Sequence, residues 1–378
     1  RAEGRAPPLE GPPRVVLLTG ATGFVGAFLL RELLLRTEAR VVCLVRAGSA
    51  EEGLRRVRTN LEGYGLWEPG LAARVELLLG DLAAPRLGLR PAAFEALAER
   101  VDTVYHAGAL VNFARGYQTL RAPNVGGTQE VLRLASTGRL KPVHFLSSAG
   151  LFTAPAYAGV ERVKEDAPLA EGRGLHSGYV ESKWVAERVL ALARERGLPV
   201  VLYRTATVAG DSRTGIGNPS DFTLRFAKGC VQMRKAPELD IPAYLAPADW
   251  VAAALVHLSL RKDSLGRTFH LVPEQPLRLG ELMEHMRELG YVLQPLPYEA
   301  WRREVLATAR TSPEHALHPF LHLFESESLM RVPLLDCGNT RAGLEGSGLT
   351  CPPLDGRLAR TYFHHMTATG FMPPPRSK

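Results

Sequence analysis

The chain has 378 residues, of which 46% are hydrophobic and 22% charged, enough to bury a large core and carry a smaller appendage. Its 46 basic and 39 acidic residues give a net charge of +7, scattered along the chain without a Lys/Arg block. This pattern argues against nucleic acid and favours an acidic partner or an anionic ligand. No run approaches the roughly 20 apolar residues of a membrane helix, and no signal peptide is visible. We therefore expect a cytoplasmic protein without a membrane partner.

The four cysteines are few for this length and show no CxxC spacing; they are Cys43, Cys230, Cys337 and Cys351. Neither a disulfide framework nor a zinc site is indicated by such spacing. We expect free thiols and no metal ligand set.

The first 13 residues, RAEGRAPPLEGPP, have the composition of a linker, which implies a domain upstream. From residue 14 to about 210, short β-branched runs alternate with segments of helical periodicity. Strands that alternate with helices form a parallel sheet covered on both faces. The sequence therefore predicts an α/β fold with a Rossmann-type, doubly wound parallel sheet.

The pattern changes after Gly210, where DSRTGIGNPSD has the composition of a loop. Residues 246–275 return to the sheet through a predicted helix, ADWVAAALVHLSL, and a last strand, RTFHLV. Residues 211–245 and 276–378 are predicted to form a smaller, mostly helical C-terminal subdomain that binds substrate.

A glycine-rich loop, GATGFVG, follows the first predicted strand with the spacing GxxGxxG. Glycines permit a sharp turn and close approach to a pyrophosphate, and the next helix, expected to begin near Ala27, offers its amides to the phosphates. A structural turn is the alternative. The predicted cofactor contacts in this loop are Gly20, Thr22, Gly23, Phe24, Val25 and Gly26.

The second predicted strand ends at Val45-Arg46, where a protein that prefers NAD would carry an acidic residue for the ribose. Arg46 suits the 2′-phosphate of NADP instead. Arg56 is either a second contact to that phosphate or part of a solvated helix face.

Two further segments follow predicted strands. Asp81 and Leu82 lie where an adenine edge is within reach, or form a strand-end turn. The small residues Ala107, Gly108 and Ala109 allow the backbone to approach a cofactor closely. His106 precedes them, and we interpret it as a buried, hydrogen-bonded residue.

The strongest chemical signal is the pair Tyr179 and Lys183, whose i, i+4 spacing places phenol and ammonium on one helical face. A cation at that position favours the phenolate and is expected to lower the tyrosine pKa. Ser148, at the carboxyl end of the strand VHFLSS, is the candidate third member and would hydrogen-bond the substrate oxygen. A turn-capping serine is the alternative, and Ser147 either caps the strand or touches the nicotinamide.

Together these motifs resemble the thioester reductase domains that end nonribosomal peptide and polyketide synthases. The resemblance rests on GATGFVG, LVRA, GDL, HAGALVNF, GYVESKW and AGDSRTGIGNPSDF, and on the tail segments CGNTRAGLEGSGLTCPPLD and GFMPPP. The terminal domains of carboxylic acid reductases and aminoadipate reductases are near relatives. One departure is Thr205, where family members usually carry proline after Tyr-Arg.

The resemblance implies NADPH as cofactor, held by the glycine loop, Arg46 and Arg56, and Ser148, Tyr179 and Lys183 as the catalytic set. Tyr179 and Lys183 are also expected to contact the cofactor, and Lys183 would hold its ribose. It implies a substrate held as a thioester on the phosphopantetheine arm of a carrier protein domain upstream in the same synthase. Reduction would release an aldehyde, and a second reduction to the alcohol is left open.

Two other functions fit the same residues. One is another extended short-chain dehydrogenase, of the nucleotide-sugar epimerase or hydroxysteroid type, and the other is a catalytically silent module that senses the dinucleotide. Two local features also have alternatives. Cys230 is interpreted as structural, against a role as acyl-accepting nucleophile. The basic segment from Arg213 to Lys235 is either a docking face for an acidic carrier protein or a solvated helix face.

Overall fold

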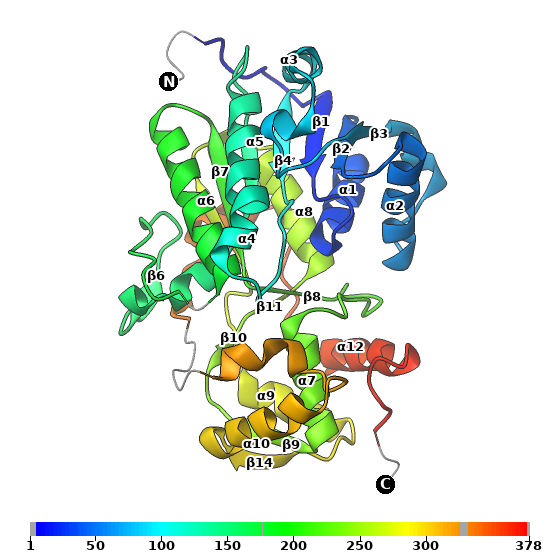
Figure 1. Ribbon diagram of the computed structural model, residues 1–378, viewed down its shortest axis with the longest axis vertical. Coiled ribbons are helices and arrows are strands. Elements are labelled where there is room, and N and C mark those ends of the chain that lie inside the picture. Colours follow the sequence, from blue (N-terminus) through cyan, green and yellow to red (C-terminus); the bar gives the residue numbers. More distant parts are fainter. Residues whose placement is uncertain (1–4, 176, 326–331, 376–378) are drawn as a thin grey trace.

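The computed structural model describes residues 5–175, 177–325 and 332–375, so residues 1–4 of the expected linker lie outside it. A central sheet of seven parallel strands runs in the order β12-β7-β5-β4-β1-β2-β3 (Figure 1). The predicted doubly wound parallel sheet is confirmed. Its strands are β1 (Val15–Thr19), β2 (Arg40–Val45), β3 (Val75–Leu79), β4 (Thr103–His106), β5 (Val143–Ser148), β7 (Val200–Thr205) and β12 (Thr268–Leu271).

The strands are apolar on both faces because both faces are covered by helices. In β1, Val16 and Leu18 point into one buried cluster and Leu17 into another, as the period of two requires. Helices α1 (Phe24–Arg36) and α8 (Ala248–Ser259) cover the first face. The opposite face is covered by α3 (Pro91–Arg100), α5 (Gly127–Ala135) and α6 (Gly178–Glu195). Helix α2 (Ala50–Gly63) flanks α1 and β3, and the short α4 (Tyr117–Arg121) packs on α6.

A third hydrophobic cluster, separate from the two on the faces of the sheet, includes the buried side chains of Phe226, Met286 and Trp301. Its helices lie beyond the carboxyl ends of the strands (Figure 1). Short strand pairs, β9 (Lys235–Glu238) with β14 (Gln294–Pro297) and β10 (Pro242–Ala243) with β13 (Leu277–Arg278), accompany its helices. Two more short strands, β8 (Thr207–Ala209) and β11 (Leu245–Pro247), pair with each other. The helices are α7 (Phe222–Met233), α9 (Leu279–Glu288), α10 (Tyr298–Thr311) and α12 (Gly356–Ala368).

Part of the tail packs differently from the predicted division of the chain. Helix α11 (Gly338–Leu344) packs on α8 and β12, and β15 (Leu334–Leu335) pairs with β6 (Arg162–Val163). The carboxylate of Glu165 holds this segment, because it accepts hydrogen bonds from the backbone amides of Asn339 and Thr340 at 2.5 and 3.1 Å. The division at residue 276 therefore does not follow the packing of this stretch, which lies against the Rossmann sheet.

The two edges of the sheet face different parts of the chain. At the amino ends of the strands, the backbone amide of Leu140 donates to the carbonyl oxygen of Ala6 at 2.9 Å, so the predicted linker lies along this edge. The carboxyl ends face the helices of the third hydrophobic cluster (Figure 1). Strand order reverses between β1 and β4, and the crevice at such a switch point is where open α/β sheets bind ligands.

Candidate active site

The glycine loop after β1 packs directly on the segment after β4. Gly20 has φ +87°, and a Cβ atom there would lie 2.7 Å from the backbone nitrogen of Gly108. At Gly26 a Cβ atom would overlap the carbonyl group of Gly20. The amide of Gly108 donates to the hydroxyl of Thr19 at 3.0 Å. The backbones of the glycine loop and of the segment after β4 are therefore in close contact where the sequence predicts a cofactor.

Helix α1 begins at Phe24, three residues before the expected start near Ala27. The reason is that Gly23 is the N-cap, and the amide of Ala27 already donates to its carbonyl at 3.1 Å. Gly23 has no side chain to cap the helix, and the first turn carries no acidic residue. The amides and the positive end of the dipole therefore suit a pyrophosphate, so these residues fit a dinucleotide.

Arg46 and Arg56 lie close together at the carboxyl end of β2. The guanidinium of Arg56 donates to the carbonyl oxygen of Arg46, and both side chains are exposed. The neighbouring Arg58 instead pairs with Glu62 at 2.8 Å and stacks over Trp67. The structure thus brings the two predicted phosphate contacts together and leaves their guanidinium faces open to solvent.

The segments after β3 and β4 have defined local roles. The carboxylate of Asp81 accepts from the amide of Ala83 at 2.9 Å, which is a strand-end turn. Leu82 packs against the backbone of Gly108, so a Cβ atom at Gly108 would lie 2.7 Å from its methyl group. Ala107 and Ala109 flank that glycine, at the crevice beside the glycine loop.

His106 is enclosed within the sheet. Its two ring nitrogens lie 2.7 Å from the hydroxyl of Thr19 and 3.1 Å from that of Thr128. Burial, with a smaller effect of the Lys183 charge, lowers the pKa of His106 to about 3. The neutral ring is therefore part of the hydrogen-bonded core, as interpreted from the sequence.

Tyr179 and Lys183 both lie in the first turns of α6, on the face that packs against β5. The ammonium of Lys183 donates to the carbonyl oxygen of Leu146 at 2.5 Å and lies 4.0 Å from the ring centroid of Phe145. The ring of Tyr179 meets that of Phe113 edge-on, with centroids 5.3 Å apart. The helix thus presents phenol and ammonium at the carboxyl edge of the sheet.

The protonation of this pair differs from the sequence-based expectation. Burial raises the pKa of Tyr179 to about 12, so the predicted lowering by a nearby cation is wrong for the protein without cofactor. Burial also lowers the pKa of Lys183 to about 7, and the carboxylate of Glu187 counteracts this effect. At neutral pH the phenol keeps its proton, which is the state that a proton donor requires.

Ser148 ends β5 and begins the turn into a short 3-10 helix, Ala149–Thr153. Its hydroxyl accepts from the amide of Gly150 at 3.1 Å. A Cβ atom at Gly150 would lie 3.3 Å from Val180, the neighbour of Tyr179. The close packing of Gly150 and Val180 brings the Ser148 end of β5 beside the first turn of α6.

Ser147 belongs to a buried polar network that the sequence analysis missed. Its hydroxyl donates to the carboxylate of Glu187 at 2.5 Å, and the other carboxylate oxygen accepts from the guanidinium Nε of Arg204 at 2.9 Å. Thr205, the departure from the family pattern, ends β7 and its hydroxyl donates to the carbonyl of Ser147 at 3.4 Å. A spacing of four residues from Lys183 to Glu187 was the signal available in the sequence.

Phe113 is a second residue that the sequence analysis missed. Its ring contacts Tyr179 and lies 6.4 Å from the ring of Phe320, which itself meets Phe222 of α7 at 5.2 Å. A row of aromatic rings therefore connects Tyr179 with the C-terminal core. Aromatic contacts between segments so distant in the chain leave no periodic signal in the sequence.

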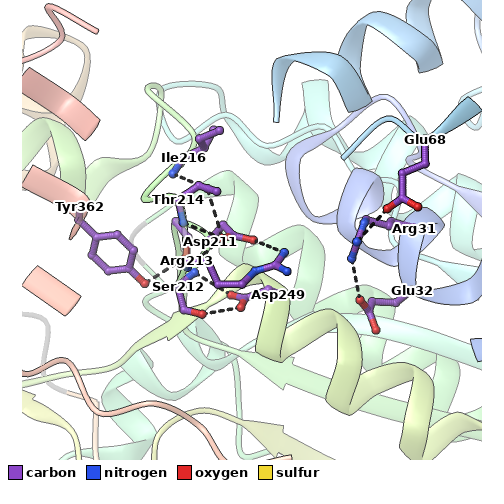
Figure 2. Close-up of polar contacts among 11 residues, drawn as sticks. Arg31, Glu32, Glu68, Asp211, Ser212, Arg213, Thr214, Ile216, Asp249 and Tyr362 are labelled. Atoms are coloured by element: carbon purple, nitrogen blue, oxygen red, sulfur yellow. Dashed lines mark hydrogen bonds and ion pairs between the residues drawn. The ribbon is translucent and has the colours of Figure 1, made fainter. Parts of the chain in front are cut away.

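The loop after β8 is fixed by two carboxylates, those of the buried Asp211 and the half-buried Asp249 (Figure 2). Asp211 accepts from the backbone amides of Arg213 and Thr214, both at 2.9 Å, and pairs with the Arg213 guanidinium at 3.2 Å. Asp249, at the start of α8, accepts from the amide and hydroxyl of Ser212 at 3.0 and 2.5 Å. Figure 2 shows Tyr362 of α12 directed at this loop, where its hydroxyl donates to the carbonyl of Gly210 at 3.0 Å.

This loop forms one wall of a cleft of about 1030 Å³ between α2 and the end of α12. The glycine loop reaches the cleft through Thr22. The volume of the cleft is that of a site for a cofactor or a small substrate. Polar side chains of α2 face apolar ones from the loop and the C-terminal end, and the residues that define the cleft include Arg55, Arg56, Asn60, Ile216, Met366 and Phe371.

Cys230 lies in α7, fully buried in the C-terminal core. Burial raises its pKa well above the usual range of a thiol, which opposes nucleophilic activation. All four cysteines are free thiols, and within the described ranges no group of three His, Cys, Asp or Glu side chains is arranged to hold a metal ion. Among the helices that the structure describes, none has the length and apolarity needed to cross a bilayer.

The basic segment from Arg213 to Lys235 is largely engaged within the protein. Lys235 pairs with Glu304 at 2.6 Å, and the ammonium of Lys228 lies 4.6 Å from the ring centroid of Phe371. The guanidinium of Arg225 donates to the carbonyl of Pro219 at 3.1 Å. These contacts weaken the prediction of a docking face, because each of these charges already has a neighbour in its own chain.

Fold and site together define a class of protein: a nicotinamide dinucleotide oxidoreductase of the extended short-chain dehydrogenase/reductase superfamily. Comparison with known proteins narrows this class. Residues 18–255 match the family model NAD_binding_4, described as male sterility protein. A linear gramicidin synthase chain of Brevibacillus parabrevis is 39% identical over 372 residues, which are 96% of this chain and 7% of that protein.

Two solved structures are also similar. The terminal R domain from the myxalamid PKS-NRPS biosynthetic pathway has a TM-score of 0.94 and 43% identity, with 99% of this chain and 96% of that chain covered. The reductase domain of a nonribosomal peptide synthetase from Mycobacterium tuberculosis has a TM-score of 0.79 and 26% identity, with 98% and 95% covered. The chain belongs to this family of terminal reductase (R) domains, and the predicted resemblance is confirmed.

Proposed function

We propose that the chain catalyses the NADPH-dependent reductive release of an acyl or peptidyl thioester, held on a carrier protein, as an aldehyde. The observation that supports this most directly is that β5 and α6 bring Ser148, Tyr179 and Lys183 to the carboxyl edge of the sheet, beside the glycine loop. The 43% identity to a terminal R domain over almost the whole chain supports a reductase with that role.

In the proposed mechanism, Ser148 and Tyr179 hydrogen-bond the carbonyl oxygen of the thioester and stabilise the negative charge that develops on it. NADPH, when bound, supplies a hydride to the carbonyl carbon. Tyr179, protonated at neutral pH, then donates its proton to this oxygen, which gives a thiohemiacetal. Collapse of the thiohemiacetal breaks the C–S bond and yields the aldehyde and the free thiol, and the proton of the hydroxyl passes to the thiolate.

Lys183 has two parts in this proposal. Its hydrogen bond to Leu146 fixes the first turns of α6 on β5, and its charge lowers the cost of an anionic phenolate after proton transfer. The pKa of Lys183, about 7, means that its ammonium is only partly populated at neutral pH without ligand. A negatively charged ligand in the crevice would favour the ammonium form.

We further propose that the cofactor is NADPH rather than NADH. The support is the pair of exposed guanidinium groups at the end of β2, Arg46 and Arg56, at a position where NAD-preferring proteins carry an acidic residue for the ribose. The glycine loop, with Gly20 in a positive φ, would hold the pyrophosphate, and Asp81, Leu82 and residues 107–109 would lie around the bound cofactor.

The proposed partner is a phosphopantetheinylated carrier domain located upstream in the same synthase. Support comes from the curated relatives, since the chain spans only 7% of the linear gramicidin synthase chain and 26% of the isonitrile lipopeptide synthase of Streptomyces coeruleorubidus. The activity and partners of such whole synthases are therefore carried to this chain as part of the proposal.

The experiment is to incubate the chain with NADPH and an acylated carrier protein and to follow the loss of nicotinamide absorbance. Parallel reactions use NADH, free carrier protein and the Tyr179→Phe variant, and chromatography separates aldehyde from alcohol. Oxidation of NADPH that requires the thioester and is lost in the variant supports the proposal. Tight NADPH binding without oxidation by any thioester would contradict it and favour an epimerase or a dinucleotide sensor.

A further inference from the structure

Glu187 is a fully enclosed carboxylate on α6, one turn after Lys183, and has no role in the mechanism above. Its side chain is 1% exposed, and its partners Ser147 and Arg204 are 3% and 2% exposed. One carboxylate oxygen accepts from the Ser147 hydroxyl at 2.5 Å and the other from two nitrogens of the Arg204 guanidinium. A buried ion pair costs desolvation energy, so complete hydrogen bonding of this kind is needed to retain it.

The three residues belong to three different elements that meet at the site. Ser147 is on β5, directly before the candidate catalytic Ser148, and Arg204 is on β7, the next strand of the sheet. Glu187 is on α6, one turn after Lys183. With the bond from Lys183 to Leu146, helix α6 is thus attached to the strand ends at two successive turns of its inner face.

Arg204 also makes contacts with residues other than Glu187. Its guanidinium donates to the carbonyl oxygen of Glu165 at 3.1 Å and lies 3.2 Å from the ring nitrogen of His270 on β12. It also lies 5.1 Å from the ring centroid of Phe152, in the turn that follows Ser148. Rotation of α6 about its axis would therefore break its contacts to β5 and to Arg204 on β7, the residue that also contacts the Ser148 turn.

We propose that Glu187 is a positioning residue of the reduction, whose buried carboxylate holds α6 in the orientation that keeps Tyr179 and Lys183 beside Ser148. This inference rests on the proposed function, since it assigns a role within that reaction. The carboxylate of Glu187 lies one turn after Lys183 on the helix, and its negative charge opposes the effect of burial on the pKa of Lys183.

The pH dependence involves the charged and titratable groups on every side of the pair. Those around Lys183 are Glu187 on its own helix and His106 on β4. Those around Glu187 are Lys183, Arg194, Arg204 on β7 and the Tyr157 phenol from the loop after β5. Loss of the carboxylate leaves Arg204 as an uncompensated positive charge, which lowers the pKa of Lys183 further.

The test compares Glu187→Gln and Ser147→Ala with wild type in single-turnover oxidation of NADPH by a medium-chain acyl pantetheine thioester, from about pH 6 to 10. We expect Glu187→Gln to lower the rate constant by up to about 100-fold, because small displacements of catalytic groups have effects of this size. Its alkaline limb should move to lower pH, since Lys183 loses its proton more easily. Ser147→Ala keeps the charge pair, so we expect a rate several-fold lower with the limb unchanged.

Asp102→Asn is the matched control for general destabilisation. Asp102 is also a buried carboxylate, which pairs with Arg139 at 2.9 Å and accepts from the amides of Arg14 and Val15, but it lies at the amino ends of the strands. The Asp102→Asn substitution should lower the melting temperature of the protein without changing the pH profile of the reaction. If the Glu187→Gln variant does not fold, the reaction rate of the Ser147→Ala variant alone tests the proposed role of Glu187.

Wild-type rates and pH profiles in both variants would overturn the role of Glu187, whatever their melting temperatures. Absence of turnover in the wild-type chain would overturn the proposed function and this inference with it. A lowered rate with a shifted alkaline limb in Glu187→Gln, against an unchanged profile in Asp102→Asn, supports the inference.

Discussion

The ammonium of Lys183 donates a hydrogen bond to the main-chain carbonyl of Leu146, 2.5 Å away, so helix α6 is fixed to strand β5. Leu146 precedes the two serines at the end of β5. This hydrogen bond therefore fixes how far along the axis of α6 the side chain of Tyr179, one turn earlier, lies relative to Ser148. Lys183 itself is enclosed, since the residue is only 4% exposed.

This enclosure makes stability depend on pH. Because burial lowers the pKa of Lys183 to about 7, the unfolded chain binds this proton more strongly than the folded chain between pH 7 and about 10.5. The free energy of unfolding contributed by Lys183 therefore rises as pH increases through that window. Lys183→Met removes the rise. Relative to the variant, the wild-type protein should gain roughly 5 kcal/mol of unfolding free energy between about pH 6 and 10.5.

Denaturant unfolding without NADPH, at several pH values, measures this difference. Comparison of wild type with the variant cancels the other titrating groups, including Lys141, whose pKa is also lowered by burial. Parallel stability curves for the two proteins would show that Lys183 keeps an ordinary pKa in the folded state.

Tyr179→Phe should lower the rate of NADPH oxidation by about 10²- to 10⁴-fold, because the proton donor is lost. The variant keeps the ring that packs on Phe113, so the fold and the affinity for NADPH should be unchanged. Single-turnover absorbance and nicotinamide fluorescence measure the two quantities. A rate close to that of wild type would exclude Tyr179 as the proton donor.

Arg46→Ala should raise the Kd for NADPH by about 10- to 100-fold and leave the Kd for NADH nearly unchanged, because a charged hydrogen bond to the 2′-phosphate is lost. Arg58→Ala is the matched control on α2, since Arg58 already pairs with Glu62 and Trp67. Fluorescence titration gives all the constants. Equal losses for both cofactors would mean that Arg46 supports the loop rather than recognises the phosphate.

Cys230→Ala should retain turnover, because the thiol is enclosed by the C-terminal core and its pKa is raised by burial. Loss of the buried sulfur should lower the unfolding free energy by about 1 kcal/mol. Turnover assays and thermal unfolding check the two expectations. A stable variant without turnover, or an acyl adduct on Cys230 seen by mass spectrometry, would replace the proposed mechanism with covalent catalysis.

Local patterns in the sequence were sufficient to predict much of the fold and several elements of the candidate site. The alternation of β-branched runs and amphipathic segments predicted the parallel sheet, because strands and helices impose their periods on the residues they bury. GxxGxxG after the first strand located the glycine loop, since Gly20 must take a positive φ and approach Gly108. The spacing of Tyr179 and Lys183 placed both on one helical face for the same local reason.

Only the tertiary structure decided the environment of those residues. The contacts that enclose Tyr179 and Glu187 come from Phe113, Ser147 and Arg204, which are distant in the chain and follow no period. Burial by such contacts determines whether a pKa rises or falls, and burial raises the pKa of Tyr179 to about 12. The sequence by itself determined which chemical groups are present and which face of each element they occupy. Their desolvation and their partners depend on the packing of separate elements, which only the folded structure defines.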